Sequence, residues 1–176
     1  MDQLLLNDDY VHRIMEVEIA LEPPSSEIVT SRNVLASVEA VFTAWSDPAY
    51  LAKWWGPRRF SNTFIEFDFR EGGNWRYIMH GPSKYNYPCE CQFKAIVPVR
   101  LIAWNQPSDP PFTAAVSFQK ITKRITNITF TMCFNDADEC ARVRKYTRFR
   151  TEQAFDKLEK ELEIMEPQSG DFKMPR

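Results

Sequence analysis

The sequence predicts an α+β domain in which a curved antiparallel sheet of about seven strands wraps around a long C-terminal helix. Three observations predict this class. Apolar and polar residues alternate in a series of short segments, which is typical of strands with one buried face. Two short amphipathic stretches follow the first of these segments, and we expect them to form two short helices. One long apolar stripe at helical spacing closes the series, and such a helix is the natural cover for the apolar face of the sheet.

The composition is that of a folded domain without a strong charge bias. A chain of 176 residues, 44% of them hydrophobic, can build a core without cross-links, because it buries roughly 70% of its unfolded surface. A net charge of −2 argues against nucleic acid and against an anionic membrane as partners. The N-terminus lacks the basic region of a signal peptide, so we expect a cytoplasmic protein whose four cysteines are reduced thiols. Cys89 and Cys91 lie only two positions apart, which does not suit a metal site, and we expect neither metal nor cofactor.

The chain is expected to divide into an extension, one domain and a tail. Residues 1–26 form the N-terminal extension, which contains both a helical and an alternating pattern and could be a helix or an edge strand. Prolines at 23 and 24 separate it from the domain, which we place at residues 27–166. Residues 167–176 form the C-terminal tail, because Pro167 ends the last helix.

Local signals predict the elements of the domain in order. A first strand is expected near residues 27–34. Ser37 is a suitable cap for a helix over residues 38–45, and Asp47 caps a second short helix opened by Pro48. Alternation then predicts strands over residues 65–70, 74–80, 85–97, 101–105, 114–121 and 125–134, followed by a helix from 135 to about 165.

The hairpin between the second and third strands has a predictable register. If both apolar sets lie on one face, Phe67 pairs with Tyr77, and Asp68 lies opposite Arg76 as a cross-strand ion pair. This register leaves a three-residue loop, Glu71-Gly72-Gly73, in which the glycines supply the positive φ that the turn needs.

Several motifs in this framework resemble one known family. They are Arg32, Ala36, Val41-Phe42, Trp45-Ser46-Asp47-Pro48, Lys53-Trp54-Trp55-Gly56-Pro57 with Phe60, Gly72-Gly73-Asn74-Trp75-Arg76-Tyr77, Met79-His80-Gly81-Pro82 and Glu152-Gln153-Ala154-Phe155-Asp156-Lys157-Leu158. Over residues 27–165 the chain resembles the activator of heat-shock-protein-90 ATPase homologue family, in the START-like (SRPBCC, birch-pollen-allergen-like) superfamily. The resemblance implies the helix-grip fold, with a hydrophobic cavity between the sheet and the long helix. Two departures are Ser83-Lys84, where the family has an acidic residue and Gly, and Arg150-Thr151, where it has Gly-Trp.

Large aromatic side chains from several elements are expected to line this cavity. A dry void of 300 Å³ would cost roughly 7 kcal/mol, against a total stability of about 5–15 kcal/mol. Either the aromatic residues therefore close the cavity, or water or a ligand occupies it. The small Thr151, where the resemblance implies Trp, enlarges the space. The residues expected to face the cavity are Trp54, Trp55, Phe67, Trp75, Tyr77, Phe118, Phe130, Thr151 and Phe155.

No residue is predicted to be catalytic. His80, the one histidine of the domain, falls on the polar face of its strand, away from the cavity. Glu66 and Asp68 lie near arginines and are expected to form solvated ion pairs rather than an acid–base pair. The basic run at the start of the last helix is expected to form a solvated face, with contact to an acidic partner or to the anionic end of a ligand as the alternative. Its members are Arg142, Arg144, Lys145, Arg148 and Arg150.

Three functions compete. The leading prediction is non-catalytic binding of a small apolar ligand in the cavity, and we do not expect an enzyme. The resemblance implies two alternatives, which are a polyketide-cyclase-like enzyme acting on a bound apolar substrate and a co-chaperone-like protein-interaction module. The first needs a titratable group that points inward, and the second usually relies on a further N-terminal domain. A homodimer stays open.

Deleting residues 140–176 is expected to abolish cooperative unfolding, because the apolar face of the sheet loses its cover. Thermal and urea unfolding, followed by circular dichroism, test this expectation. A truncated chain that still unfolds in one sharp transition would contradict the architecture.

Overall fold

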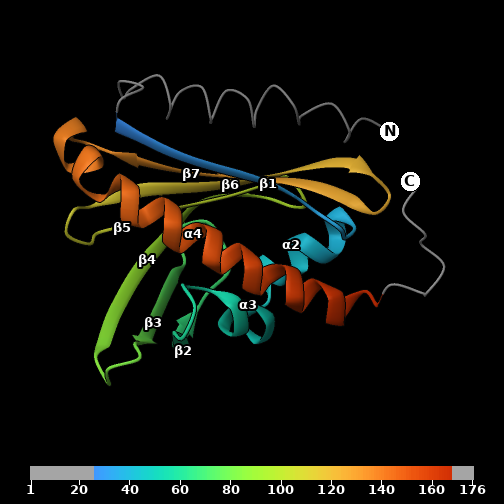
Figure 1. Ribbon diagram of the computed structural model, residues 1–176, viewed down its shortest axis with the longest axis horizontal. Coiled ribbons are helices and arrows are strands. Elements are labelled where there is room, and N and C mark those ends of the chain that lie inside the picture. The colour runs from blue at the N-terminus through green and yellow to red at the C-terminus, as the bar shows by residue number, and fades with distance from the viewer. Residues whose placement is uncertain (1–25, 168–176) are drawn as a thin grey trace.

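A seven-stranded antiparallel sheet with the order β1-β7-β6-β5-β4-β3-β2 forms the body of the protein in the computed structural model, which describes residues 26–167. Figure 1 shows that the sheet is curved and that the long helix α4 crosses it diagonally, while α2 and α3 lie toward one end of α4. The elements are β1 (Glu27–Val34), α2 (Val38–Ser46), α3 (Pro48–Trp54), β2 (Ser61–Phe67), β3 (Asn74–His80), β4 (Asn86–Val97), β5 (Leu101–Gln106), β6 (Phe112–Thr122), β7 (Ile125–Phe134) and α4 (Ala137–Met165). The predicted α+β class is therefore confirmed. The expected N-terminal extension and C-terminal tail lie, apart from Ser26 and Pro167, outside the described residues.

The helices begin where capping residues predict. The side chains of Ser37 and Asp47 accept hydrogen bonds from backbone N–H groups in the first turns of α2 and α3, and Pro48 opens α3. Asp136 caps α4 in the same way. Each cap satisfies a donor that the helix itself leaves without a partner, so these short polar side chains fix the starting points of all three helices.

The predicted register of the β2–β3 hairpin is wrong by two residues. Phe67 lies opposite Trp75, and Arg76 lies opposite Glu66, not Asp68. The Arg76 guanidinium is 3.4 Å from the Glu66 carboxylate. A bulge between residues 64 and 66 breaks the pairing, and Ile65 within it is 58% exposed.

The cause of this shift is a longer turn, which begins at residue 68 and is closed by the backbone. Arg70 N–H donates to Asp68 O at 2.8 Å, and Gly73 N–H donates to Arg70 O at 2.9 Å. The turn is also tied to β4, because Gly72 N–H donates to Phe93 O and Phe93 N–H donates to Gly73 O. Gly72 supplies the positive φ of +76°, whereas Gly73 is required for space, since a Cβ there would lie 2.0 Å from Asp68 O.

The two halves of α4 have different surroundings. In the C-terminal half, Phe155, Leu158 and Leu162 are almost fully buried against the core of the sheet. In the N-terminal half, Val143 and Thr147 continue the same stripe but are only half-buried. The stripe predicted from helical spacing therefore faces inward throughout, but it packs less closely between the fully buried Cys140 and the buried Ala154. Space remains between the first half and the sheet.

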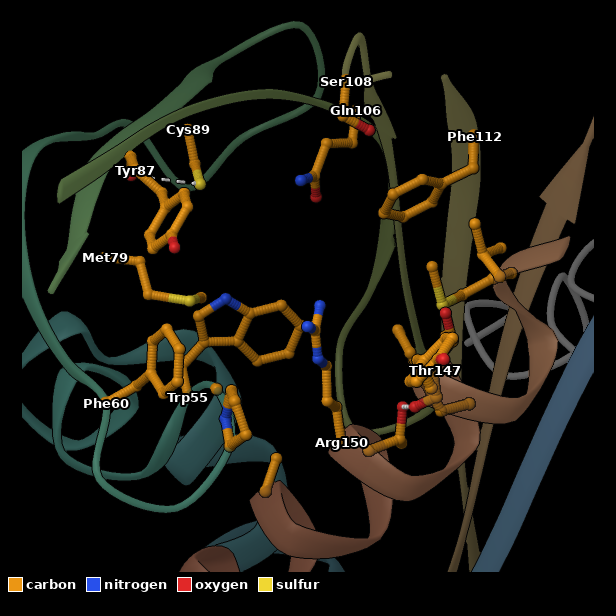
Figure 2. Close-up of a pocket in the computed structure, with 18 of the residues that line it drawn as sticks. Trp55, Phe60, Met79, Tyr87, Cys89, Gln106, Ser108, Phe112, Thr147 and Arg150 are labelled. Carbon is orange, nitrogen blue, oxygen red and sulfur yellow. Dashed lines mark hydrogen bonds between the residues drawn. The ribbon is translucent and has the colours of Figure 1, made fainter. Parts of the chain in front are cut away.

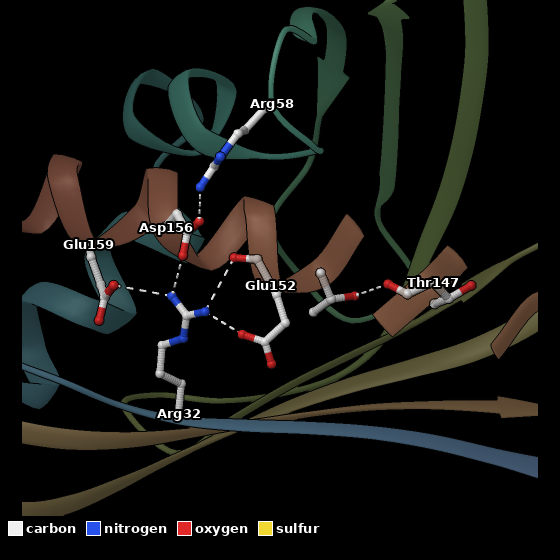
Figure 3. Close-up of polar contacts among 7 residues, drawn as sticks. Arg32, Arg58, Thr147, Glu152, Asp156 and Glu159 are labelled. Carbon is white, nitrogen blue, oxygen red and sulfur yellow. Dashed lines mark hydrogen bonds and ion pairs between the residues drawn. The ribbon is translucent and has the colours of Figure 1, made fainter. Parts of the chain in front are cut away.

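Arg32 on the edge strand β1 fixes the middle of α4. Figure 3 shows its guanidinium surrounded by carboxylates from successive turns of the helix. Nη1 donates to Asp156 at 2.9 Å and to Glu159 at 3.1 Å, and Nη2 contacts the Glu152 carboxylate. The guanidinium also lies over the ring of Phe155, 5.6 Å from its centroid. Hydrogen bonds with Arg32, and then with Arg58, lower the pKa of the Asp156 carboxyl.

Gly73→Ala is expected to destabilise the fold by about 3 kcal/mol, because the added Cβ collides with the backbone carbonyl of Asp68. The matched control is Gly72→Ala, where nothing lies within 4 Å and only the positive φ is unfavourable. We expect that change to cost about 1 kcal/mol. Urea unfolding measures both values, and equal losses for the two variants would contradict the turn described above.

Arg32→Met is expected to lower the free energy of unfolding by about 2 kcal/mol at pH 7, since three carboxylates lose their shared cation. The pKa of Asp156 is lower in the folded state, so its contribution exists above the unfolded value of about 3.9 and is lost as the pH falls through the lowered folded value. The difference between wild type and variant should therefore shrink in acid. Urea unfolding at pH 7 and at about pH 2.5 tests this.

Arg58→Met is the control for this comparison. Arg58 contacts Asp156 at 2.6 Å, but its side chain is 65% exposed, so we expect a loss of only about 0.5 kcal/mol. If Arg32→Met lowers the free energy of unfolding no more than Arg58→Met does, or by an amount that does not change with pH, the contacts of Arg32 with the three carboxylates contribute little to holding α4.

Candidate ligand-binding cavity

A cavity of about 650 Å³ lies between the N-terminal half of α4 and the sheet. Its volume falls within the range of about 300–1,000 Å³ that is usual for small-molecule sites. Side chains from α4, from strands β3 to β7 and from the loop after α3 form its walls. Figure 2 shows the labelled side chains arranged around an open central space.

Six of the nine side chains predicted to face the cavity line it in the structure. The other three pack into the aromatic core instead, where Phe118 contacts Trp45 at 6.1 Å between ring centroids and Phe67 contacts Phe93 at 5.6 Å. Trp75 lies behind Trp55, 5.2 Å from its ring. Some side chains on the concave face of the sheet therefore pack into the core and others line the cavity. Alternation along a strand predicts which side chains lie on this face but not which of them border the cavity. The six lining residues are Trp54, Trp55, Tyr77, Phe130, Thr151 and Phe155.

All five tryptophans of the chain belong to one contact cluster that forms the floor of the cavity. Trp45 lies 4.6 Å from Trp54, and Trp104 lies 5.8 Å from Trp75, again between ring centroids. The rings meet mostly edge-to-face or tilted, the arrangements that aromatic pairs prefer. This packing makes the floor rigid and apolar, and it accounts for much of the 14% aromatic content of the chain.

A chain of hydrogen bonds satisfies the polar groups on one wall. Trp55 Nε1–H donates to the Tyr77 hydroxyl at 2.9 Å, Tyr77 in turn hydrogen-bonds to Cys89, and the Cys89 thiol donates to Tyr87 O at 3.5 Å. Burial raises the pKa of the Tyr77 hydroxyl well above its ordinary value and also raises the pKa of the Cys89 thiol. Both groups are therefore neutral at pH 7, and neither provides a base or a thiolate nucleophile.

Two polar side chains that point into the cavity lie outside this chain of hydrogen bonds. Arg150 rises from α4 into the open space, and Gln106 points into it from the end of β5 (Figure 2). The Cys91 thiol donates to Gln106 Oε1 at 3.5 Å, which leaves the Nε2 amide group directed away from that contact. Between residues 26 and 167, Arg150 has no hydrogen-bond or ion-pair partner. Neither residue was predicted as a site residue.

The basic run between residues 142 and 150 is largely exposed, as expected, and four of its five members also line the cavity or contact β1. Arg142 and Arg150 line the cavity. Arg144 and Arg148 instead donate to backbone carbonyls of β1, at 2.9 and 3.4 Å. Within residues 26–167, β1 is an edge strand of the sheet, so Arg144 and Arg148 cover part of that edge.

The loop that follows α3 forms part of the cavity rim, and hydrogen bonds attach this loop to α4. Lys157 Nζ donates to the carbonyl oxygens of Gly56 and Phe60 at 3.3 and 3.1 Å, and both residues line the cavity. Gln153 accepts a hydrogen bond from the backbone of Arg58 at 3.2 Å. Burial lowers the pKa of the Lys157 ammonium. The same helix therefore positions one wall and one rim.

His80 lies away from the cavity, where Thr63 Oγ1 and Asn86 Oδ1 are 2.8 and 2.7 Å from its two ring nitrogens. The described part of the chain contains no group of three or more His, Cys, Asp or Glu side chains arranged to hold a metal ion. No helix within residues 26–167 is long and apolar enough to cross a membrane.

A curved antiparallel sheet, a long helix across it and two short helices after the first strand together define the helix-grip fold, as the resemblance implied. The chain belongs to the family described as Activator of Hsp90 ATPase homolog 1-like protein, which matches residues 35–163. No curated protein is significantly similar to the chain.

Solved structures share this fold at low sequence identity. A protein from Nitrosomonas europaea is 19% identical, with a TM-score of 0.73 over 81% of this chain and 97% of its own. One from Arthrobacter aurescens is 20% identical, with a TM-score of 0.74 over 85% and 94%. An AHSA1-like protein from Aeromonas hydrophila is 16% identical, with a TM-score of 0.66 over 84% and 99%. At these identities the likeness concerns the fold alone.

Proposed function

We propose that the protein binds a small apolar ligand, without catalysis, in the cavity between α4 and the sheet. The observation that carries this proposal is an aromatic cavity of about 650 Å³ on a rigid floor. The cavity opens to solvent, so water fills it when no guest is bound. A flat apolar guest that displaces this water from the aromatic floor is favoured by the apolar area that it buries.

The chemistry of the walls favours binding over catalysis. Tyr77 and Cys89 are the titratable groups on the hydrogen-bonded wall, and burial keeps both neutral at pH 7. A polyketide-cyclase-like enzyme would need a group in the cavity that moves protons near neutral pH.

Thr151 offers the sharpest test, because it lines the cavity and is small. The neutral fluorescent dye N-phenyl-1-naphthylamine is expected to bind the wild type with a micromolar dissociation constant and to be displaced by neutral apolar compounds such as long-chain alcohols and naphthalene derivatives. Thr151→Trp should weaken dye binding at least about tenfold, which is about 1.4 kcal/mol, by occupying the space. It should leave the melting temperature unchanged or slightly raised.

Glu163→Trp is the matched control, since Glu163 is exposed on the same helix and does not line the cavity. It adds the same ring but should leave dye binding unchanged. If the wild type does not bind the dye or any of these neutral compounds below about millimolar, and Thr151→Trp is strongly destabilising, the region is packed core and the proposal fails.

A further inference from the structure

We infer that the ligand is an amphipathic carboxylic acid, whose carboxylate is held by Arg150 and the Gln106 amide while its apolar body lies on the aromatic floor. This inference rests on the proposed function and adds the chemical class of the ligand. It starts from an arginine that is exposed to the solvent-filled space of a mainly aromatic cavity and has no hydrogen-bond or ion-pair partner within residues 26–167 (Figure 2).

The helix offers Arg150 no acidic neighbour. The positions three and four residues away on either side are Tyr146, Thr147, Gln153 and Ala154, none of which carries a charge at pH 7. Side chains at these spacings are the ones that meet on a helix surface, so no intrahelical ion pair can form. The nearby acids of α4 bind Arg32 on the opposite side of the helix. The guanidinium is therefore available to a ligand.

The lining as a whole carries an excess of positive charge. Arg142 joins Arg150 on the cavity wall, and Asp109, in an exposed loop, is the acidic residue of the lining. A neutral guest that covered Arg150 would strip water from a cation without replacing it, which is unfavourable. An anionic guest replaces that water with a charge-assisted hydrogen bond.

The number of donors favours a carboxylate over a phosphate. A guanidinium presents two parallel N–H groups to the two oxygens of a carboxylate, and this pairing is planar and bidentate. Gln106 adds an amide donor from the facing wall, because the Cys91 thiol occupies its carbonyl oxygen at 3.5 Å. One cation and one amide match a single negative charge, whereas a phosphate group carries up to two charges and more acceptor oxygens.

The test compares acids with their neutral isosteres, namely decanoic acid with decanamide and 2-naphthoic acid with 2-naphthamide. Each compound displaces N-phenyl-1-naphthylamine from the purified full-length protein at pH 7.5. The wild type is expected to bind each acid about tenfold more tightly than its amide. Raising the salt concentration from about 0.05 to 0.5 M should reduce this preference, because part of it is Coulombic.

Arg150→Gln should abolish the preference by weakening the acids about tenfold while leaving the amides unchanged. Arg150→Lys keeps the charge but not the bidentate geometry, so an intermediate preference is expected. Arg148→Gln is the matched control, since Arg148 contacts β1 and does not line the cavity, and it should behave as wild type.

The outcomes separate this inference from the proposed function. If the wild type binds acids and amides equally well, or if Arg150→Gln weakens both classes equally, the carboxylate site is refuted and apolar binding stands. If neither the dye nor any of the four compounds binds, the proposed function fails and the inference fails with it. An acid preference that survives in Arg150→Gln but is lost in Arg142→Gln would also overturn the assignment to Arg150.

Discussion

The contact between Arg32 and three carboxylates of α4 is the constraint on which the architecture of the site depends. A helix of 29 residues can pack on a curved sheet along only part of its length. Arg32 determines which part, because it fixes the middle turns of α4 to the edge strand β1 and places Phe155 against the core. The C-terminal turns then pack closely on the core, whereas the N-terminal turns are tied to β1 by Arg144 and Arg148 and leave space over the centre of the sheet. The cavity is this space.

The aromatic residues follow the same division. Those near α2 and α3 interlock into a continuous cluster, in which Trp45 contacts both Trp54 and Phe118. Those farther along the sheet, such as Phe130, have the cluster on one side and open space on the other. A close-packed interior tolerates few voids, so an opening of this size is stable only beside a floor that does not collapse into it. The tryptophans provide that rigidity.

Much of the fold was predictable from the sequence, because its signals are local. β1 and β7 have the predicted bounds, and Ser37 and Asp47 mark the helix starts as expected. The β2–β3 register was not predictable, since the longer turn that sets it is closed partly by hydrogen bonds between Gly72, Gly73 and Phe93 of β4. Helical periodicity likewise predicted the inward face of α4 but not the extent of the space beside it. Arg150 is exposed, as expected, but the space that it faces is the cavity, which periodicity alone does not predict.

Positions 150 and 151 bring these arguments together. The resemblance implies Gly-Trp there in relatives, a pair that would place an indole beside the floor and no side chain next to it. This chain has Arg150-Thr151, so bulk disappears at one position and a cation appears at its neighbour. A cavity enlarged without a polar group would suit any apolar guest, and a cation without added space would have no guest to bind. Under the two proposals, the space beside the small Thr151 takes the apolar body of the ligand while Arg150 meets its carboxylate, so the two positions act together.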